Sequence, residues 1–434
     1  MTHSARSQRT LAVDALQRVE GEGAMHVEIR DGRVEDVQLR IYEPPRFFEA
    51  FLRGRRYTEP PDITARICGI CPVAYQMSAC QAIEAACGVT VGGQLAELRK
   101  LLYCGEWIES HALHIYLLHA PDFLGYENAV ALAADHRDLV ERGLGLKKVG
   151  NEVLELIGGR AIHPVNVKVG GFYRVPTRRE LRPLRDRLEQ ALESALATVS
   201  WVSGFDFPEL STELELVALR SPGEYAVLGG RLVSTGGLDL GPEEYDAHFV
   251  EEHVAHSTAL HSRMRERGSY LVGPLARYAL GSADLAPVAR EAAREAGLGA
   301  EERNPFRSIV VRAVETVHAC AEGLRIIDAY DEPDSPAVAV EPREGAGCGW
   351  TEAPRGTLWH RYELAGDGRI VSARIVPPTS QNQPAIEHDL FHLVEANLDL
   401  ADEALRLRCE QAIRNYDPCI SCATHFLDLT VART

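Results

Sequence analysis

Two Cys-x-x-Cys pairs at opposite ends of the chain constrain its fold more than any other feature. Cys68 and Cys71 form the first pair, and Cys419 and Cys422 form the second. Thiolates offered three residues apart are ligands that soft transition metals prefer. Zinc ribbons place their two pairs roughly 15–20 residues apart, because a small module must close around the ion. Here almost the whole chain lies between the pairs, so one shared site requires both ends of the chain to meet inside a large fold.

Charge and composition narrow the class of protein. The chain has 434 residues, of which 45% are hydrophobic and 25% charged, as is ordinary for globular proteins. Its formal charge of −17 argues against nucleic acid or an anionic membrane as the main partner. We find neither an apolar run that could span a bilayer nor the apolar segment of a signal peptide. Ten cysteines are too few for a disulfide scaffold in a chain of this length. We therefore expect a cytoplasmic protein with no membrane span and no nucleic-acid partner.

Apolar periodicity predicts a mainly helical body. Pro72 and Gly88 bound the first helix with the residues favoured at a helix start and just past its end, which puts Cys71 at a helix N-terminus. The helix dipole there favours the thiolate of Cys71. Alternating apolar and polar residues around an Asp-Gly pair predict β-hairpins over residues 25–42 and 362–375. We expect helices over residues 73–87, 95–118, 179–203, 286–296, 304–330 and 388–416.

The fold class follows from this pattern. The chain shows no internal repeat and no low-complexity linker, so we expect a single domain over residues 1–434. Its class is α+β and predominantly helical, with one large helix-bundle body that carries small β-hairpin elements. Within such a body, the simpler interpretation of the four cysteines is a structural zinc site or a rubredoxin-like iron site. Spacing alone does not reject that interpretation.

The residues around the cysteines carry a more specific signal. The sequence reads Arg-Ile-Cys-Gly-Ile-Cys over residues 66–71 and Asp-Pro-Cys-Ile-Ser-Cys-Ala-Thr-His over residues 417–425. Both segments resemble the first and last signatures of nickel-iron hydrogenase large subunits. Further blocks in the same order extend the resemblance over nearly the whole chain, and the cytoplasmic, nucleotide-coupled branch of the family is the most similar. These blocks are residues 18–21, 46–49, 159–164, 352–356 and 378–382.

The resemblance implies the roles of the four cysteines. Cys68 and Cys419 are expected as terminal nickel ligands, and Cys71 and Cys422 as bridges from nickel to iron. Two divalent metals can balance the four negative charges of the thiolates. The enzyme expected from this resemblance interconverts dihydrogen with protons and electrons by heterolytic cleavage, and Cys419 is the metal-bound base.

Further site residues are carried over from the same blocks. The iron of this family also holds carbon monoxide and cyanide, and buried cyanide nitrogens need hydrogen-bond donors. Arg355 and Thr379, with the adjacent Pro378, occupy the matching positions for that role. Magnesium is expected at Glu49, the carbonyl of Ile375 and His425, a mixed but acceptable ligand set for a hard cation. Glu20 matches the first carboxylate of the proton relay. If the resemblance is set aside, the simpler interpretation is that three charged residues lie on the surface without a special role. These residues are Glu20, Glu49 and Arg355.

Partners and processing are implied in the same way. Six cysteines remain, without iron-sulfur spacing, and no dinucleotide-binding fingerprint is present, so the chain offers no electron path of its own. We expect an iron-sulfur small subunit, which Arg160 and His163 would contact, and nucleotide-binding diaphorase subunits that pass electrons to NAD or NADP. Residues 426–434 resemble the short extension that a maturation endopeptidase removes after His425. The alternative interpretation of this segment is an ordinary chain terminus that frays.

Three residues depart from the better known membrane-linked members of the family. Ser110 replaces an aspartate near the metals, and Tyr75 and Glu22 replace histidines. Two other functions share the fold. A hydrogen sensor is the first, although sensors generally lack the removable extension; a quinone-reductase-type relative is the second, but it loses the four cysteines that this chain keeps.

Overall fold

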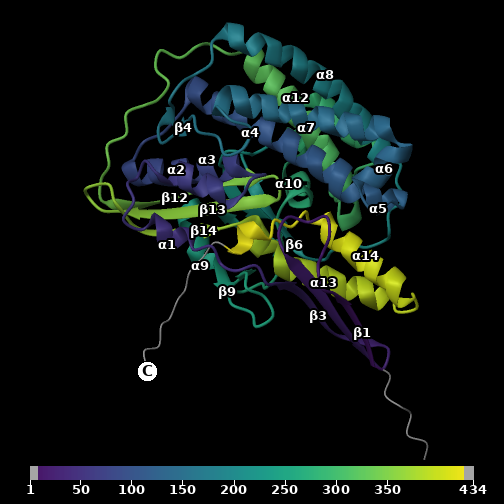
Figure 1. The fold of residues 1–434 in the computed structure, drawn as a ribbon. Helices are drawn as coiled ribbons and strands as arrows, with labels where there is room; N and C mark the ends of the chain where they lie inside the picture. Colours follow the sequence, from purple (N-terminus) through teal and green to yellow (C-terminus); the bar gives the residue numbers. More distant parts are fainter. Residues whose placement is uncertain (1–7, 425–434) are drawn as a thin grey trace, which may run out of the picture.

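The computed structural model describes residues 8–424. Its upper layer is a bundle of long helices (Figure 1), α4 (Gly93–Leu113), α7 (Arg137–Gly158), α8 (Arg178–Val202) and α12 (Ser308–Asp328). The helices α4 and α7 cross closely because Gly150 has no side chain. A Cβ atom at Gly150 would lie 2.6 Å from both the carbonyl oxygen of Gly105 and the backbone nitrogen of Glu109.

Shorter helices lie within the helical layer and beside the sheets. A π-helical turn (His114–His119) continues α4 into α5 (Ala120–Leu124). The side chain of Asn128 accepts hydrogen bonds from two amides at the start of α6 (Ala129–Asp135), as an N-cap residue does. The remaining short helices are α1 (Phe48–Leu52), α2 (Pro60–Thr64), α9 (Tyr245–His248), α10 (Pro274–Gly281) and α11 (Pro287–Glu295).

An antiparallel sheet of β12 (Gly345–Ala353), β13 (Gly356–Leu364) and β14 (Ile370–Val376) lies under α3 (Pro72–Cys87). Gly347 allows this contact, since a Cβ atom there would lie 2.2 Å from the carbonyl oxygen of Ala82 on α3. The pairing of Ala353 with Gly356 leaves Pro354 and Arg355 as the two-residue turn of the β12–β13 hairpin. The turn therefore carries one of the expected site residues.

The two ends of the described chain lie side by side. An N-terminal sheet of β1 (Gln8–Val13), β2 (Gly23–Arg30) and β3 (Arg33–Ile41) packs beside α13 (Pro378–Ala396) and α14 (Asp402–Asn415) (Figure 1). The Arg9 guanidinium joins them by donating to the carbonyl oxygens of Leu398 (3.0 Å) and Leu400 (2.7 Å). A metal site shared by both chain ends requires these ends to lie close together, and they do.

Three further sheets complete the fold. One has the order β11-β6-β7-β8, in which β11 and β6 are parallel, and the others pair β9 with β10 and β4 with β5. Their bounds are β4 (Val167–Lys168), β5 (Gly171–Phe172), β6 (Glu215–Arg220), β7 (Arg231–Ser234), β8 (Asp239–Leu240), β9 (Phe249–Glu252), β10 (His261–Met264) and β11 (Tyr270–Leu271). Over residues 8–424, no helix is both long and apolar enough to cross a bilayer.

Most predicted elements are present, with two corrections. The prediction of one helix over residues 388–416 is wrong, because α13 starts ten residues earlier and ends at Ala396 before α14 begins. Asn397 leaves the helical region (φ −130°), and its carbonyl accepts from the Leu400 amide in a turn. The second correction is β12, a glycine-rich strand that extends the predicted 362–375 hairpin to three strands.

Candidate metal centre

The first cysteine pair lies where a short 3₁₀ turn (Ala65–Ile67) meets α3. Cys71 is the N-cap residue of α3, as predicted, and Gly88 ends the helix with a left-handed φ of 68°. Buried Glu106 on α4 accepts hydrogen bonds from the amides of Val73 (2.6 Å) and Ala74 (3.2 Å), groups that have no partner inside the helix. Contacts from the bundle therefore fix the direction in which α3 starts.

The second pair follows α14 in a loop held by the N-terminal segment. The Ile420 amide donates to the Glu20 backbone carbonyl (2.9 Å). Arg46 reaches both cysteine loops, because its Nη2 donates to the carbonyl oxygen of Ile67 (2.7 Å) and to that of Ser421. The backbone amide of Arg46 also donates a hydrogen bond to the carbonyl oxygen of Thr424 (2.6 Å). The Arg46 side chain thus ties the two loops together.

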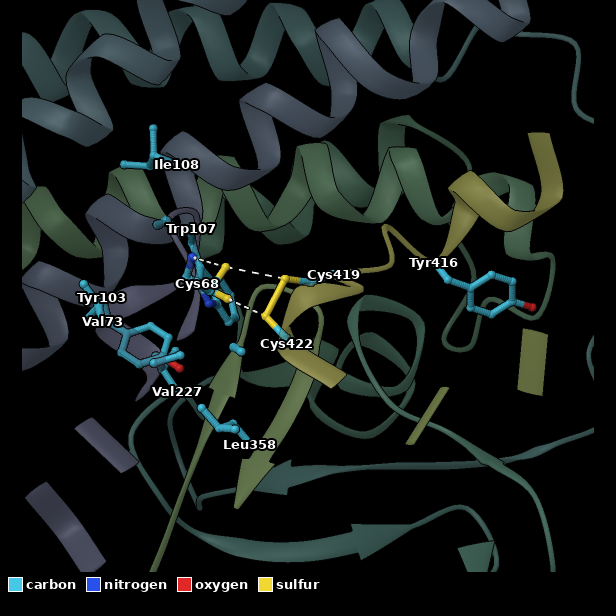
Figure 2. Packing of buried hydrophobic residues seen from close by; sticks show 14 of the residues in the cluster. Cys68, Val73, Tyr103, Trp107, Ile108, Val227, Leu358, Tyr416, Cys419 and Cys422 are labelled. Carbon is cyan, nitrogen blue, oxygen red and sulfur yellow. Dashed lines mark hydrogen bonds between the residues drawn. A yellow bond between two sulfur atoms is a disulfide. The ribbon is translucent and has the colours of Figure 1, made fainter. Parts of the chain in front are cut away.

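The four sulfurs converge on one buried point. All four Sγ atoms lie within 4.8 Å of one another. Cys68 Sγ is 3.5 Å from Cys419 Sγ, and Cys71 Sγ is 3.9 Å from Cys422 Sγ. Figure 2 shows Cys68 facing Cys419 and Cys422 across this short gap. Metal–sulfur bonds of about 2.3 Å in a tetrahedron place sulfurs roughly 3.8 Å apart. The spacing fits soft-metal binding, and by itself it does not distinguish one ion from two.

One pair is oxidised in the structure. Cys419 and Cys422 form a disulfide, whereas Cys68 and Cys71 are free thiols. All four predicted cysteines lie in the cluster that could hold a metal ion, and the role of each as a ligand stays a prediction. Two sulfurs three residues apart in a tight turn are within bonding reach of each other.

Charge around the first pair favours ionisation of Cys68. The hydrogen bond from Cys71 lowers the pKa of Cys68, against the opposing effect of burial, and the Arg355 charge lowers it further. Backbone amides of Ile70 and Cys71 also donate to Cys68 Sγ, each at 3.3 Å. The same hydrogen bond and burial raise the pKa of Cys71. The predicted dipole effect at Cys71 is therefore outweighed, and Cys68 ionises first.

Arg355 extends from its hairpin turn to the loop before Cys419. Its Nε donates to the carbonyl oxygen of Asp417 (2.6 Å), and its Nη2 donates to Asp417 Oδ1 (3.1 Å). The third nitrogen, Nη1, is buried and has no hydrogen-bond partner within the described chain. Thr379 Oγ1, next to Pro378 at the start of α13, accepts from the Cys419 amide (3.0 Å). This side of the centre therefore offers a charged donor and a hydroxyl.

Glu20 lies against the second pair. Its Oε2 is 3.2 Å from Cys419 Sγ and accepts a hydrogen bond from the Ser421 amide (3.0 Å). The Glu20 side chain is partly exposed, so one carboxylate lies between a buried sulfur and the outside of the fold.

Two of the expected magnesium ligands meet. Glu49 Oε1 accepts from the Ile375 amide at 2.8 Å, and burial raises the pKa of Glu49 to about 8. His425, the third expected ligand, and residues 426–434 lie outside the described residues.

Sequence reasoning missed three residues that shape the centre: Arg46, Glu106 and Asp417. Arg46 and Asp417 stand inside blocks that carried the resemblance, so their positions were marked but their contacts were not. Glu106 lies in a helix with no motif, and no sequence signal identifies it. Ser110 is buried, and its hydroxyl has no hydrogen-bond partner among residues 8–424.

Comparison with known proteins identifies the family of this chain. Residues 46–152 and 267–425 match the nickel-dependent hydrogenase family. Sulfhydrogenase 1 subunit alpha of Pyrococcus furiosus is 34% identical over 96% of this chain and 98% of that protein. The NAD-reducing hydrogenase HoxS subunit beta of Cupriavidus necator is 28% identical over 96% of this chain and 95% of that subunit. A crystal structure of an NAD⁺-reducing [NiFe]-hydrogenase superposes with a TM-score of 0.86 at 29% identity, covering 97% of this chain and all of that one.

The chain belongs to the nickel-dependent hydrogenase family. It is a catalytic large subunit, an oxidoreductase that acts on dihydrogen. The family is nickel-dependent, and the four cysteines of this chain form a cluster that could bind a metal ion.

Proposed function

We propose that Cys68, Cys71, Cys419 and Cys422 together hold nickel and iron, and that the chain splits and forms dihydrogen there. The convergence of four sulfurs from both ends of the chain within 4.8 Å carries this proposal. When bound, the two metals polarise dihydrogen, which has no charge or dipole that side chains can recognise. The protein's part is to hold the sulfurs, exclude water and accept a proton. In the proposed roles, Cys68 and Cys419 are terminal nickel ligands, while Cys71 and Cys422 bridge to iron.

The donors beside the centre fit the diatomic ligands proposed for iron. Carbon monoxide and cyanide bound to iron would lie on the side of Arg355, Thr379 and Pro378. Arg355 Nη1 is buried without a hydrogen-bond partner in the described chain, and a buried donor of this kind is costly to leave unpaired. A cyanide nitrogen would accept from it, and Asp417 holds the guanidinium in place.

Proton transfer is proposed to run from the Cys419 sulfur to Glu20. The 3.2 Å separation is within hydrogen-bond reach of a reduced thiol, which a general base requires. The Ser421 amide holds the same carboxylate oxygen and so fixes its position. Partial exposure of Glu20 supports onward transfer away from the centre.

Magnesium is proposed to bind beside the second cysteine loop. The contact of Glu49 with the backbone of Ile375 supports this, and His425 would complete the protein ligands. A cation there would favour the charged form of Glu49, whose pKa burial otherwise raises.

Electrons are proposed to leave through an iron-sulfur small subunit. Cysteines outside the centre are buried and scattered in the described chain, so they form no cluster site. An exposed apolar patch near the first cysteine pair supports a docking face, with Ile162 54%, Val165 42% and Tyr173 59% exposed. His163 Nδ1 donates to the carbonyl of Ala65, which links this surface, and the neighbouring Arg160, to the Cys68 loop.

The acceptor and cellular setting are proposed from the relatives. Two of the compared proteins are named as NAD-reducing hydrogenases, which supports diaphorase subunits and NAD or NADP as the acceptor. A reducing compartment, the cytoplasm, suits a centre built from thiolates. Residues 426–434 are proposed as an extension that a maturation endopeptidase removes from the single domain after His425.

Metal analysis and a coupled assay of the assembled complex test this function. One nickel and one iron per chain, with hydrogen-dependent reduction of NAD⁺ or NADP⁺, are expected. If nickel and iron are both bound but the complex does not reduce NAD⁺ or NADP⁺ with hydrogen, the result would instead indicate a hydrogen sensor. Zinc alone would contradict the proposal.

A further inference from the structure

A second cluster of metal-ligating side chains lies apart from the sulfur centre. His256 stands in the loop between β9 and β10, His261 is the first residue of β10, and Glu387 projects from α13. One ligand atom from each lies within 4.8 Å of the others. Three different segments of the fold therefore bring two imidazoles and a carboxylate to one point.

His261 is the residue that ordinary packing does not explain. Its side chain is 0% exposed, and neither ring nitrogen has a hydrogen-bond partner in the part of the chain described. Leaving buried polar atoms unpaired costs free energy, so such a residue needs an explanation. Gln383, one turn before Glu387 on α13, also has a buried Nε2 without a partner.

Glu387 is held in place by groups outside the cluster. Its Oε1 accepts from the Leu39 amide (2.9 Å) and lies 2.7 Å from His256 Nε2. Its Oε2 lies 3.9 Å from His261 Nδ1, beyond hydrogen-bond distance. An outer partner such as the Leu39 amide is what orients a ligating carboxylate.

The alternative is a hydrogen-bonded pair of His256 and Glu387. That pair satisfies those two residues and leaves His261 with only the Gln383 side chain as a possible hydrogen-bond partner, in a geometry that makes no regular hydrogen bond. A metal ion accounts for all three. Bonds of about 2.0–2.2 Å to nitrogen and oxygen place tetrahedral ligand atoms roughly 3.3–3.6 Å apart. The observed 2.7 Å and 3.9 Å lie on either side of that spacing, and the partly exposed His256 can adjust.

The basic side chain nearest to this cluster in sequence leaves room for a metal cation. Arg263 is the closest basic side chain in the strand that starts with His261, and its Nε is 3.7 Å from Glu252 while its Nη1 donates to Ser269 (3.5 Å). Its guanidinium is thereby held toward other groups, although its positive charge still acts on His261 and Glu387. Two histidines with one carboxylate suit zinc or a similar divalent transition ion with an open position for water.

We propose that His256, His261 and Glu387 bind one zinc-type divalent ion that fastens the loop after β9 to α13. This loop also packs against Ile420, which lies between the two cysteines of the second pair. The Thr258 amide donates to the carbonyl of Ile41 (2.7 Å), and Ala259 packs in one small buried cluster with Ile420. The ion therefore stabilises the wall against which the Cys419–Cys422 loop rests.

The test is zinc binding by the assembled enzyme with its nickel and iron already in place. Equilibrium dialysis against zinc chloride is expected to add one zinc per chain. Glu387→Gln, which keeps an acceptor for Leu39, and His256→Asn, which changes a partly exposed residue, are each expected to lose that zinc. Their nickel and iron contents are expected to stay at the wild-type level, which shows that both variants fold.

The control removes a competing surface site. His388 and His392 on the same helix have Nε2 atoms 3.3 Å apart, so they are the other histidine pair that could account for the single added zinc. His392→Asn is expected to keep the added zinc. The zinc absorption edge of the wild type is expected to report nitrogen and oxygen neighbours at about 2.0–2.1 Å. No added zinc, zinc lost only with His392→Asn, or sulfur neighbours at about 2.3 Å would each overturn the proposal.

Discussion

A single oxygen of Glu20 contacts both the sulfur of Cys419 and the amide of Ser421. The amide fixes where the carboxylate stands, and the sulfur is the atom from which a proton would come. A substitution that keeps the shape of the Glu20 side chain but removes its basic oxygen therefore tests proton acceptance without changing the position of the side chain.

Glu20→Gln is such a substitution. The amide oxygen still accepts from Ser421, but the side chain no longer takes up a proton. We expect hydrogen–deuterium exchange activity to fall by roughly 10²–10⁴-fold, the usual contribution of a general base, with nickel and iron retained. Glu22→Gln, two residues later and exposed, is the control and should exchange at the wild-type rate. Full activity in Glu20→Gln would remove Glu20 from the pathway.

Arg46 acts by joining two loops. Its guanidinium donates to carbonyl oxygens beside both cysteine pairs, and hydrogen bonds from charged groups contribute about 1.5–3 kcal/mol each. We expect Arg46→Ala to lower the melting temperature and the nickel content, since the loops lose their connection. Arg53→Ala, on an exposed residue of the same segment, should change neither. Wild-type nickel content in Arg46→Ala would show that the loops do not depend on this contact.

At the scale of helices and strands, the sequence predicted features that depend on local residues, but it did not predict contacts between distant segments. Pro72 and Gly88 define α3 from sequence alone, because each residue has a fixed conformational preference. Asn397 carries only a weak stop signal, which the helical pattern on both sides obscured. The contact of Arg355 with Asp417 depends on packing between a hairpin and a distant loop, which no local pattern encodes. Convergence of the cysteines was predictable through the resemblance.

The close crossing of α4 and α7 gives a prediction about helices. A Cβ atom at Gly150 would overlap backbone atoms of α4, the helix that carries Glu106 and Ser110. We expect Gly150→Ala to destabilise the protein by about 1–3 kcal/mol, as overpacking does. Gly145→Ala on the same helix meets nothing within 4 Å and should be neutral or stabilising by up to about 1 kcal/mol. Thermal unfolding of the two variants checks this, and equal melting temperatures would contradict it.

For the molecule as a whole, buried histidines link stability to pH. Burial lowers the pKa of His119 well below 6.5 and that of His318 to about 4. The unfolded chain gains protons near pH 6.5 while the folded chain does not. This part of the stability is therefore complete above pH 6.5 and is lost as pH falls, by up to about 1.4 kcal/mol per histidine and pH unit.

His119→Phe isolates this effect. The ring keeps its place beside Phe123 and cannot take up a proton in either state. Buried carboxyl groups that titrate in the same range are common to both proteins, so the comparison cancels them. We expect the melting temperature of the wild type to fall more steeply than that of His119→Phe as pH decreases from 6.5 toward 4. Parallel curves would contradict the assignment.

The account depends on both chain ends holding one nickel-iron centre. Anomalous-scattering maps at the nickel and iron edges, from crystals of the assembled enzyme, test this most directly. We predict one nickel peak and one adjacent iron peak among the sulfurs of Cys68, Cys71, Cys419 and Cys422. A zinc peak alone at these sulfurs, or a nickel peak away from either cysteine pair, would contradict it.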